Sequence, residues 1–367
     1  MKSQQKKTKA LFLHKILIMI DFSERLSNWY HANGRSLPWR QTTDPYHIWI
    51  SEIILQQTQV KQGLDYYHRF INRFPNVEKL AKADEDEVLK LWQGLGYYSR
   101  ARNLHTAAKS ILIFHNAQFP NSYKEILNLK GIGPYTAAAV SSFAFNLPYA
   151  VVDGNVYRFL SRLFGISTPI DSTAGKKHFH NLAQELLDRK DPASHNQAIM
   201  EMGALQCKPF SPNCAECPFA DRCIAFSTGR VEDFPVKEKR TKQRHRYFSY
   251  LYLVENNKLV INKRQGNDIW KNLYELPLIE SPKPLTIKKL KTSFNTDHQT
   301  LKLLDEKKHI LSHQIIHTRF YLSSALPNST GRKEEWMTVP IPELKHYAFP
   351  QLIVNFLNEQ GLSIDHK

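Results

Sequence analysis

The feature that most constrains this chain is the placement of its four cysteines, which all lie within one short segment. They follow the spacing Cys207-x6-Cys214-x2-Cys217-x5-Cys223. Four thiolates so close together can surround one metal centre, and both iron–sulfur clusters and zinc prefer thiolate ligands. A disulfide framework would spread its cysteines over a secreted domain, so the pattern indicates a metal-binding loop in a reducing compartment.

The spacing leaves two kinds of metal centre open. Zinc sites with four cysteines usually bring two CxxC pairs together from separate hairpins. This loop has one CxxC pair, flanked on each side by a single cysteine. This arrangement favours a 4Fe–4S cluster as the predicted cofactor, with all four cysteines as metal ligands, and leaves a zinc site as the alternative.

The charge balance predicts a polyanionic partner. The 367 residues include 50 Lys and Arg against 34 Asp and Glu, a formal net charge of +16. Such an excess favours nucleic acid ahead of a membrane surface, although a basic surface that only maintains solubility is the alternative. No run of 18 apolar residues is present, so no membrane partner is predicted. Residues 1–20 carry an apolar stretch broken by His14 and Lys15, which indicates a basic N-terminal tail and not a signal peptide.

Helical periodicity covers residues 21–226 and predicts an all-α domain. Asp44 and Pro45 have the character of an N-cap and a first helical residue, which opens a helix extending to about Gln62. Further helices are expected over residues 85–96, 99–115, 134–145 and 155–165, the last of them closed by Gly165.

The pattern changes after the cysteine loop. The charged stretch from Val236 to Arg246 predicts an exposed linker, which we assign to residues 227–246. Residues 247–264 alternate in polarity and are rich in β-formers, with Asn256-Asn257 placed as a hairpin turn. Residues 247–360 are therefore predicted to form a smaller α+β domain.

The segment Leu129–Ala137, LKGIGPYTA, predicts a helix-hairpin-helix. Gly131 and Gly133 permit a tight turn whose backbone N–H groups can approach a phosphate beside the positive end of the next helix. Such contacts position DNA without reading its sequence. A helix–turn–helix that serves packing alone is the alternative.

Two carboxylates are candidates for chemistry. Glu52 shares a helical face with Ile48 and Leu55, and desolvation on an apolar face would raise its pKa so that it holds a proton near neutrality. Asp153 follows the hairpin by about twenty residues, and taken alone it predicts a helix N-cap. A protonated and an ionised carboxyl together suit cleavage of a glycosidic bond. A glutamate at the edge of an amphipathic face is the alternative for Glu52.

These motifs together resemble the MutY family of adenine DNA glycosylases, which belongs to the helix-hairpin-helix class. The resemblance runs from about Trp29 to the C-terminal region through LPWR, SEIILQQTQV, GLGYYSRARNL, LKGIGPYTA, VVDGNVYR and the cysteine loop. It implies an all-α glycosylase domain with an iron–sulfur loop and a C-terminal MutT-like, or Nudix-like, domain. The implied reaction is hydrolysis of the N-glycosidic bond to adenine mispaired with 8-oxoguanine or guanine in double-stranded DNA.

The resemblance also implies a role for individual residues. Glu52 would protonate the leaving adenine, Asp153 would stabilise or capture the C1′ cation, Asn155 would support that site, and Tyr135 would pack at the flipped nucleotide. Gln57 and Tyr97 would enter the duplex beside the 8-oxoguanine. The implied DNA- and substrate-binding residues are Trp39, Arg40, Gln57, Thr58, Tyr97, Gly131, Gly133, Gln197, Ser312 and His313.

Position 135 separates two related activities. Endonuclease III has a Schiff-base lysine at this place in its hairpin, whereas this chain has Tyr135, and a lyase needs that amine as a nucleophile. The difference favours a monofunctional glycosylase over the runner-up, an endonuclease III-like lyase acting on damaged pyrimidines. A non-catalytic DNA-binding protein on the same scaffold is a third reading, which the presence of both Glu52 and Asp153 disfavours.

The second domain favours the same family, because endonuclease III lacks one. The glutamate-rich box by which Nudix hydrolases bind Mg²⁺ is not present, so the domain is predicted to recognise 8-oxoguanine and not to hydrolyse pyrophosphate. Ser312 and His313 occupy the family's Phe-Ser-His loop, with Leu311 in place of the phenylalanine, and an ordinary Ser-His pair in a surface loop is the alternative. We expect a monomer that works in the cytoplasm at the nucleoid; the sequence does not identify protein partners.

Overall fold

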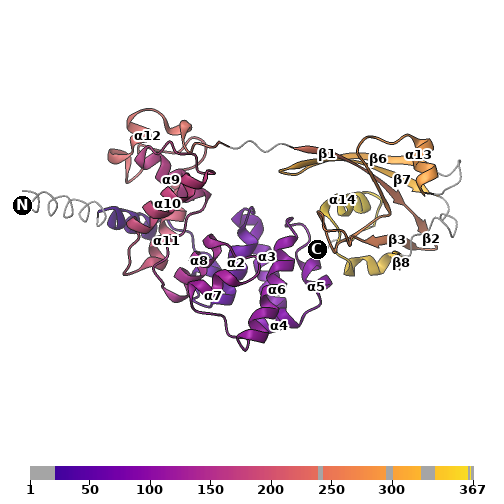
Figure 1. Cartoon of the computed structure of the whole chain (residues 1–367), viewed down its shortest axis with the longest axis horizontal. Coiled ribbons are helices and arrows are strands. Elements are labelled where there is room, and N and C mark those ends of the chain that lie inside the picture. The colour runs from indigo at the N-terminus through magenta and orange to yellow at the C-terminus, as the bar shows by residue number, and fades with distance from the viewer. Residues whose placement is uncertain (1–20, 239–242, 295–300, 324–334, 363, 365–367) are drawn as a thin grey trace, which may run out of the picture. The chain divides into compact units, whose positions relative to one another are not determined.

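The computed structural model describes residues 21–238, 243–294, 301–323, 335–362 and 364 (Figure 1). The predicted basic tail, residues 1–20, and residues 239–242 of the predicted linker lie outside these residues. The chain forms two compact units. Unit 1 consists of Met1–Tyr67 and Ser110–Lys239, and unit 2 of His68–Lys109 and Arg240–Lys367.

Unit 1 is helical in its described residues. Residues 21–33 form its first described helix. The further elements are η1 (Pro38–Arg40), α2 (Pro45–Leu55), the start of α3 (Val60–Arg73), the end of α6 (Ser99–Phe114), α7 (Tyr123–Asn128), α8 (Pro134–Phe145), α9 (Gly154–Phe164), α10 (Thr173–Leu186), α11 (Pro192–Glu201), the π-helical turn η2 (Met202–Gln206), η3 (Ala220–Arg222), α12 (Ile224–Ser227) and η4 (Val231–Asp233).

Local capping chemistry explains where several of these helices begin and end. The Asp44 side chain accepts a hydrogen bond from the backbone of Tyr46, and Pro45 occupies the first turn of α2. Pro134 likewise opens α8. Gly165 ends α9 with φ of 61°, a left-handed conformation in which glycine carries no Cβ penalty.

The predicted length of the first long helix is wrong. Helix α2 ends at Leu55, and α3 begins at Val60, whereas the sequence pattern predicts one helix to about Gln62. Gln56 leaves the helical region with ψ of 114°, and Gln57 has φ of 58°. The predicted helix over 85–96 is also shorter, because α5 (Glu85–Leu91) ends before Gly94, whose φ is 96°.

Unit 2 contains helices from the first half of the chain and all of the described strands. Its helices are the end of α3, α4 (Val77–Lys82), α5, the start of α6, α13 (Ile287–Phe294), η5 (Ile341–His346) and α14 (Gln351–Glu359). Its strands are β1 (Arg244–Tyr252), β2 (Val254–Glu255), β3 (Lys258–Lys263), β4 (Tyr274–Glu275), β5 (Leu278–Ser281), β6 (Leu301–Ile310), β7 (Gln314–Ser323) and β8 (Trp336–Pro340).

The strands form two sheets. The first has the order β5-β1-β7-β6, in which β1 and β7 are parallel and the other pairs are antiparallel. In the second sheet β3 pairs with β2, β4 and β8. Asn256 and Asn257 connect β2 to β3 with φ of 48° and 61°, as the predicted hairpin turn requires.

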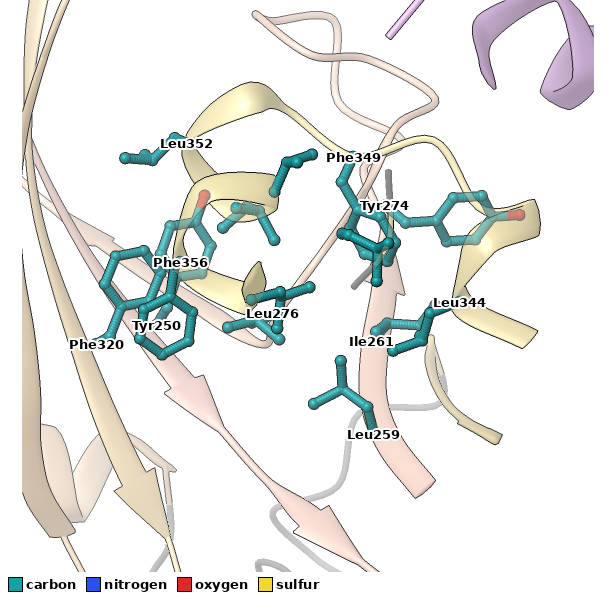
Figure 2. Packing of buried hydrophobic residues seen from close by; sticks show 14 of the residues in the cluster. Tyr250, Leu259, Ile261, Tyr274, Leu276, Phe320, Leu344, Phe349, Leu352 and Phe356 are labelled. Carbon is teal, nitrogen blue, oxygen red and sulfur yellow. The ribbon is translucent and has the colours of Figure 1, made fainter. Parts of the chain in front are cut away.

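Helix α14 packs against both sheets. Figure 2 shows Phe356 of α14 beside Tyr250 and Phe320 of the first sheet, and the Phe320 and Phe356 rings stack at 3.8 Å. Leu259 and Ile261 of the second sheet belong to the same buried cluster. The burial of these large apolar side chains supplies the core of the C-terminal part of the chain.

Strand β1 begins at Arg244, within the stretch whose charge predicts an exposed linker through Arg246. Arg246 is buried, because its guanidinium donates to the carboxylates of Glu280 and Asp268. A run of charges therefore predicts solvent exposure wrongly where the charges are paired. Among the described residues, the structure has no helix long and apolar enough to cross a membrane.

Candidate active site

A cavity of about 410 Å³ in unit 1 contains both candidate carboxylates in its wall. Glu52 comes from α2 and Asp153 from the N-cap of α9, so two segments about a hundred residues apart meet here. The other predicted site residues in this wall are Trp39, Arg40, Gln57, Thr58, Tyr135, Asn155 and Gln197.

Glu52 is buried and bonded to one side chain. It is 7% exposed, and its Oε2 accepts a hydrogen bond of 2.8 Å from the hydroxyl of Tyr135, in the first turn of α8. Burial raises the pKa of Glu52 to about 7, with Tyr135 acting to lower it and the nearby charge of Asp153 to raise it. A carboxyl with this pKa can hold and release a proton at neutral pH.

Asp153 caps α9 and faces the cavity with the same carboxylate. Its Oδ1 accepts hydrogen bonds from the backbone of Asn155 and Val156, and its Oδ2 accepts one of 2.7 Å from the Asn155 side chain. Burial raises the pKa of Asp153, while these hydrogen bonds act in the opposite direction by stabilising the charged form. Asp153 is therefore both the N-cap that the sequence predicts and a residue of the cavity wall.

Arg158 connects this carboxylate site to the cysteine loop. Its Nη2 donates to Asn155 Oδ1 at 2.9 Å, and its Nε donates to the carbonyl oxygen of Cys207 at 2.8 Å. The guanidinium therefore fixes the Asn155 amide with its nitrogen towards Asp153.

The sequence reasoning missed a buried ion cluster in the cavity wall. Glu201, the last residue of α11, is fully buried and accepts hydrogen bonds from the guanidinium groups of Arg35 and Arg40. The family resemblance implies a substrate-binding role for Arg40, but no sequence motif points to Arg35 or Glu201. The only sequence signal for Glu201 is its position four residues after Gln197, which places the side chains of Gln197 and Glu201 on one face of α11. Arg35 has no comparable signal.

The aromatic and amide candidates occupy different parts of the wall. Trp39 is almost fully buried and packs edge-on against Tyr67 at 5.2 Å. Gln57 is exposed, and Thr58 beside it donates to the carbonyl oxygen of Gln56 at 3.4 Å. The positive φ of Gln57, unusual for a residue other than glycine, holds it outside both α2 and α3.

The predicted hairpin lies between α7 and α8. Gly131 has φ of 80°, a conformation that strongly favours glycine, and Gly133 is the N-cap of α8. Both glycines are exposed, and a Cβ added at Gly133 would meet nothing within 4 Å. The N-terminus of α8 is therefore open to an approaching anion.

The cysteine loop brings all four thiols to one cavity. Phe159, Leu163 and Phe219 supply apolar parts of its wall, and Arg162 Nη1 lies 3.5 Å from Cys207 Sγ. Arg162 also donates to the carbonyl oxygens of Lys208 and Pro209, which fixes the loop backbone. Within the described part of the chain, no three acidic, histidine or cysteine side chains converge as ligands of a single metal ion.

The remaining candidates belong to unit 2. Tyr97 has φ of 47° and is 49% exposed, and its hydroxyl lies 2.9 Å from Ser312 Oγ. Ser312 and His313 are exposed in the turn between β6 and β7, and the Arg244 backbone N–H donates to the His313 carbonyl. Unit 2 therefore brings together two of the residues expected to contact the base opposite adenine.

Comparisons with known proteins match two separate stretches of the chain. Residues 50–195 match the family model of the HhH-GPD superfamily of base excision DNA repair proteins, and residues 249–359 match the NUDIX domain. The adenine DNA glycosylase of Buchnera aphidicola subsp. Baizongia pistaciae is 38% identical over 80% of this chain and 83% of its own length. The enzyme of the same name from subsp. Acyrthosiphon pisum is 32% identical over 92% of this chain and 96% of its own length.

Solved structures resemble the helical part. A thermostable thymine-DNA glycosylase aligns with a TM-score of 0.54 and 29% identity, over 57% of this chain and 97% of its own. A non-covalent endonuclease III–DNA complex aligns with a TM-score of 0.51 over 59% of this chain and 97% of its own, at 20% identity, and supports the fold alone.

Proposed function

The chain belongs to the adenine DNA glycosylases and is a DNA N-glycosylase that removes adenine in base excision repair, and on this premise we propose that it removes adenine paired with 8-oxoguanine or guanine, using the cavity that Glu52 and Asp153 share. The observation that carries this assignment is the pair of carboxyl groups facing one cavity, one of them with a pKa of about 7. Since adenine in a duplex cannot reach a buried acid, the nucleotide must flip out, and a mispair lowers the free energy that flipping costs.

Glu52 is the general acid of the proposal. Adenine leaves poorly as an anion, so a proton delivered to its ring lowers the barrier to departure. The Tyr135 hydroxyl holds the Glu52 carboxyl in one orientation and occupies one of its oxygens. Below pH 7 the carboxyl is largely protonated and ready to donate.

Asp153 stabilises the positive charge that develops at C1′ as the base leaves. The three hydrogen bonds from the start of α9 keep its carboxylate fixed before the reaction begins. Asn155 belongs to the same arrangement, because Arg158 holds its amide. Water then takes the place of the base, leaving an abasic site. Because position 135 carries a phenol and not an amine, the proposal is a monofunctional enzyme.

The DNA contacts follow from the same placement. Trp39, Arg40 and Gln197 line the cavity that would accept adenine. Gly131 and Gly133 would bind a phosphate at the open end of α8. Gln57 and Tyr97 would enter the duplex beside the 8-oxoguanine, and Thr58 would contact the DNA next to Gln57. Ser312 and His313 would contact 8-oxoguanine, supported by the hydrogen bond between Tyr97 and Ser312.

The cysteine loop would hold a 4Fe–4S cluster. The four thiols line one cavity, and a guanidinium beside Cys207 suits a thiolate centre. When bound, the cluster supplies rigidity to the loop, and no step of hydrolysis runs through it. The proposal also includes a monomeric enzyme that works in the cytoplasm at the nucleoid, where thiols remain reduced.

The decisive experiment is single-turnover base release from duplexes carrying adenine opposite 8-oxoguanine, adenine opposite guanine, or thymine glycol opposite adenine. We expect adenine release from the first two, strand breaks only after alkali, and loss of release in Glu52→Gln with DNA binding retained. Strand cleavage at thymine glycol without alkali would show instead a lyase of the endonuclease III type. Ser312→Ala should lower the ratio of the rate opposite 8-oxoguanine to the rate opposite guanine. The same ratio in wild type and in Ser312→Ala would contradict the assigned 8-oxoguanine contact.

A further inference from the structure

One tyrosine outside the cavity wall is bonded to a side chain within it. Tyr30 lies in the helix over residues 21–33, and its hydroxyl donates a hydrogen bond of 2.8 Å to Oε1 of Gln197. Gln197 is part of the cavity wall, on α11, whereas Tyr30 is not. The bond joins positions 167 residues apart in the chain.

This hydrogen bond favours one orientation of the Gln197 amide, because a phenol hydroxyl is a better hydrogen-bond donor than acceptor and therefore prefers the amide oxygen. A glutamine amide has one acceptor oxygen and two N–H donors. Tyr30 occupies the oxygen, and among the described residues the amide nitrogen has no protein acceptor. The group that Gln197 offers to the cavity is therefore a donor.

The neighbouring groups explain why this polarity matters. Arg40 also offers N–H donors in the cavity wall, and its guanidinium lies 5.9 Å from the centre of the Tyr30 ring. Glu201 is the acceptor on the same face of α11. Adenine offers acceptors at its ring nitrogens and donors only at its exocyclic amine, so a fixed N–H donor beside a carboxylate complements an adenine edge.

We infer that Tyr30 is a positioning residue for adenine recognition: by holding Oε1 of Gln197, it fixes the amide with its N–H groups towards the base. Without the hydroxyl, the amide would rotate by half a turn at little energetic cost and would present its oxygen to a ring nitrogen in part of the population. An acceptor facing an acceptor forms no hydrogen bond, so the pocket would lose a contact to adenine. This inference rests on the proposal that adenine enters this cavity.

Tyr30→Phe isolates the hydroxyl, because the ring and its contact with Arg40 remain. A double-mutant cycle with Gln197→Ala tests the inference, measured as the single-turnover rate of adenine release at saturating enzyme. We expect Tyr30→Phe to lower the rate about 3- to 10-fold, the worth of one neutral hydrogen bond. In the Gln197→Ala background the same change should have no further effect, because the amide that Tyr30 orients is gone.

Two measurements separate positioning from general damage to the fold. Tyr30→Phe should keep the wild-type melting temperature and the wild-type Kd for the duplex. The matched control is Tyr123→Phe, which removes the hydroxyl of another half-buried tyrosine, stacked on Tyr149 and outside the cavity wall, and should leave the rate unchanged.

The outcomes distinguish this inference from the proposed function. If Gln197→Ala itself leaves the rate unchanged, adenine does not bind against Gln197, and the proposed adenine-binding cavity is contradicted. If Gln197→Ala lowers the rate but Tyr30→Phe does not, or if the two losses multiply in the double variant, only the positioning role is overturned.

Discussion

The hydroxyl of Tyr135 lies 2.8 Å from Oε2 of Glu52 and donates a hydrogen bond to it. Burial favours the neutral acid, whereas this bond favours the carboxylate, and the balance leaves the pKa of Glu52 at about 7. The tyrosine thus adjusts how readily its neighbour gives up a proton, in addition to fixing where that proton points. This relationship has a direct consequence for the pH dependence of the reaction.

The first prediction concerns the alkaline side of the pH–rate profile. The proposal makes the protonated form of Glu52 the active one, so adenine release should fall as the pH rises above about 7. Tyr135→Phe removes the bond that favours the carboxylate, so the pKa of Glu52 should rise and the alkaline fall should move up by ~0.5–1 pH unit. Single-turnover rates between pH 5.5 and 9.5 check this. If the alkaline fall in the rate of Tyr135→Phe stays at the wild-type pH or moves to lower pH, the assignment of Glu52 as the general acid is contradicted.

The second prediction separates the two tasks of Asp153. Asparagine is as good an N-cap as aspartate, so Asp153→Asn should keep α9, with a slightly lower melting temperature because its amide nitrogen cannot accept the hydrogen bond from the Asn155 side chain. The same variant loses the negative charge that the proposal assigns to stabilising the C1′ cation, and it should release adenine ~10²–10³-fold more slowly. Asp153→Ala should lose both functions, with about 1 kcal/mol less stability. Equal rates in Asp153→Asn and wild type would remove Asp153 from the mechanism.

The third prediction tests the hairpin as a DNA anchor. Gly131 has φ of 80°, so Gly131→Ala should strain the turn by about 1–2 kcal/mol and weaken duplex binding. Gly361 has the same φ and open space around it, so Gly361→Ala is a control with equal strain. We expect only the first variant to lose affinity, measured by titration at several salt concentrations. Wild-type affinity should fall steeply with salt, and a flat response would contradict phosphate binding.

The fourth prediction concerns the cysteine loop. Protein prepared without oxygen should be brown and contain iron and sulfide, and Cys217→Ser should lose colour and stability, because one thiolate ligand is removed. Absorbance spectra and metal analysis provide the measurement. A colourless preparation containing zinc would overturn the cluster assignment and restore the alternative that the spacing left open.

The parts of the fold that sequence could predict depend on short-range chemistry. The start of α2 at Pro45, the opening of α8 at Pro134 and the end of α9 at Gly165 all follow from residues adjacent to the boundary. The break after Leu55 could not be predicted in this way, because Gln56 and Gln57 are ordinary helix formers and no glycine or proline marks the change.

Long-range pairing limits what sequence can show of the site. Glu52 could be predicted from the apolar face that it shares, and Asp153 from its distance to the hairpin. Glu201 gave no comparable signal, because its buried charge is balanced by Arg35 and Arg40, more than 160 residues earlier in the chain. The buried position of Arg246 was likewise hidden, since its acidic partners come from separate segments.

The hydrogen bonds that Asp153 accepts at the start of α9 limit which substitutions this position can accept during evolution. Oδ1 of this carboxylate caps the start of α9, and the same group lies in the wall of the proposed active-site cavity, so the carboxylate cannot turn without exposing unpaired backbone N–H groups. A substitution that alters the reaction at this position therefore also alters folding, unless it is asparagine. With the proposed role of Asp153, the stability of α9 and catalysis depend on one side chain, so few substitutions at this position would remove the chemistry and keep the helix cap.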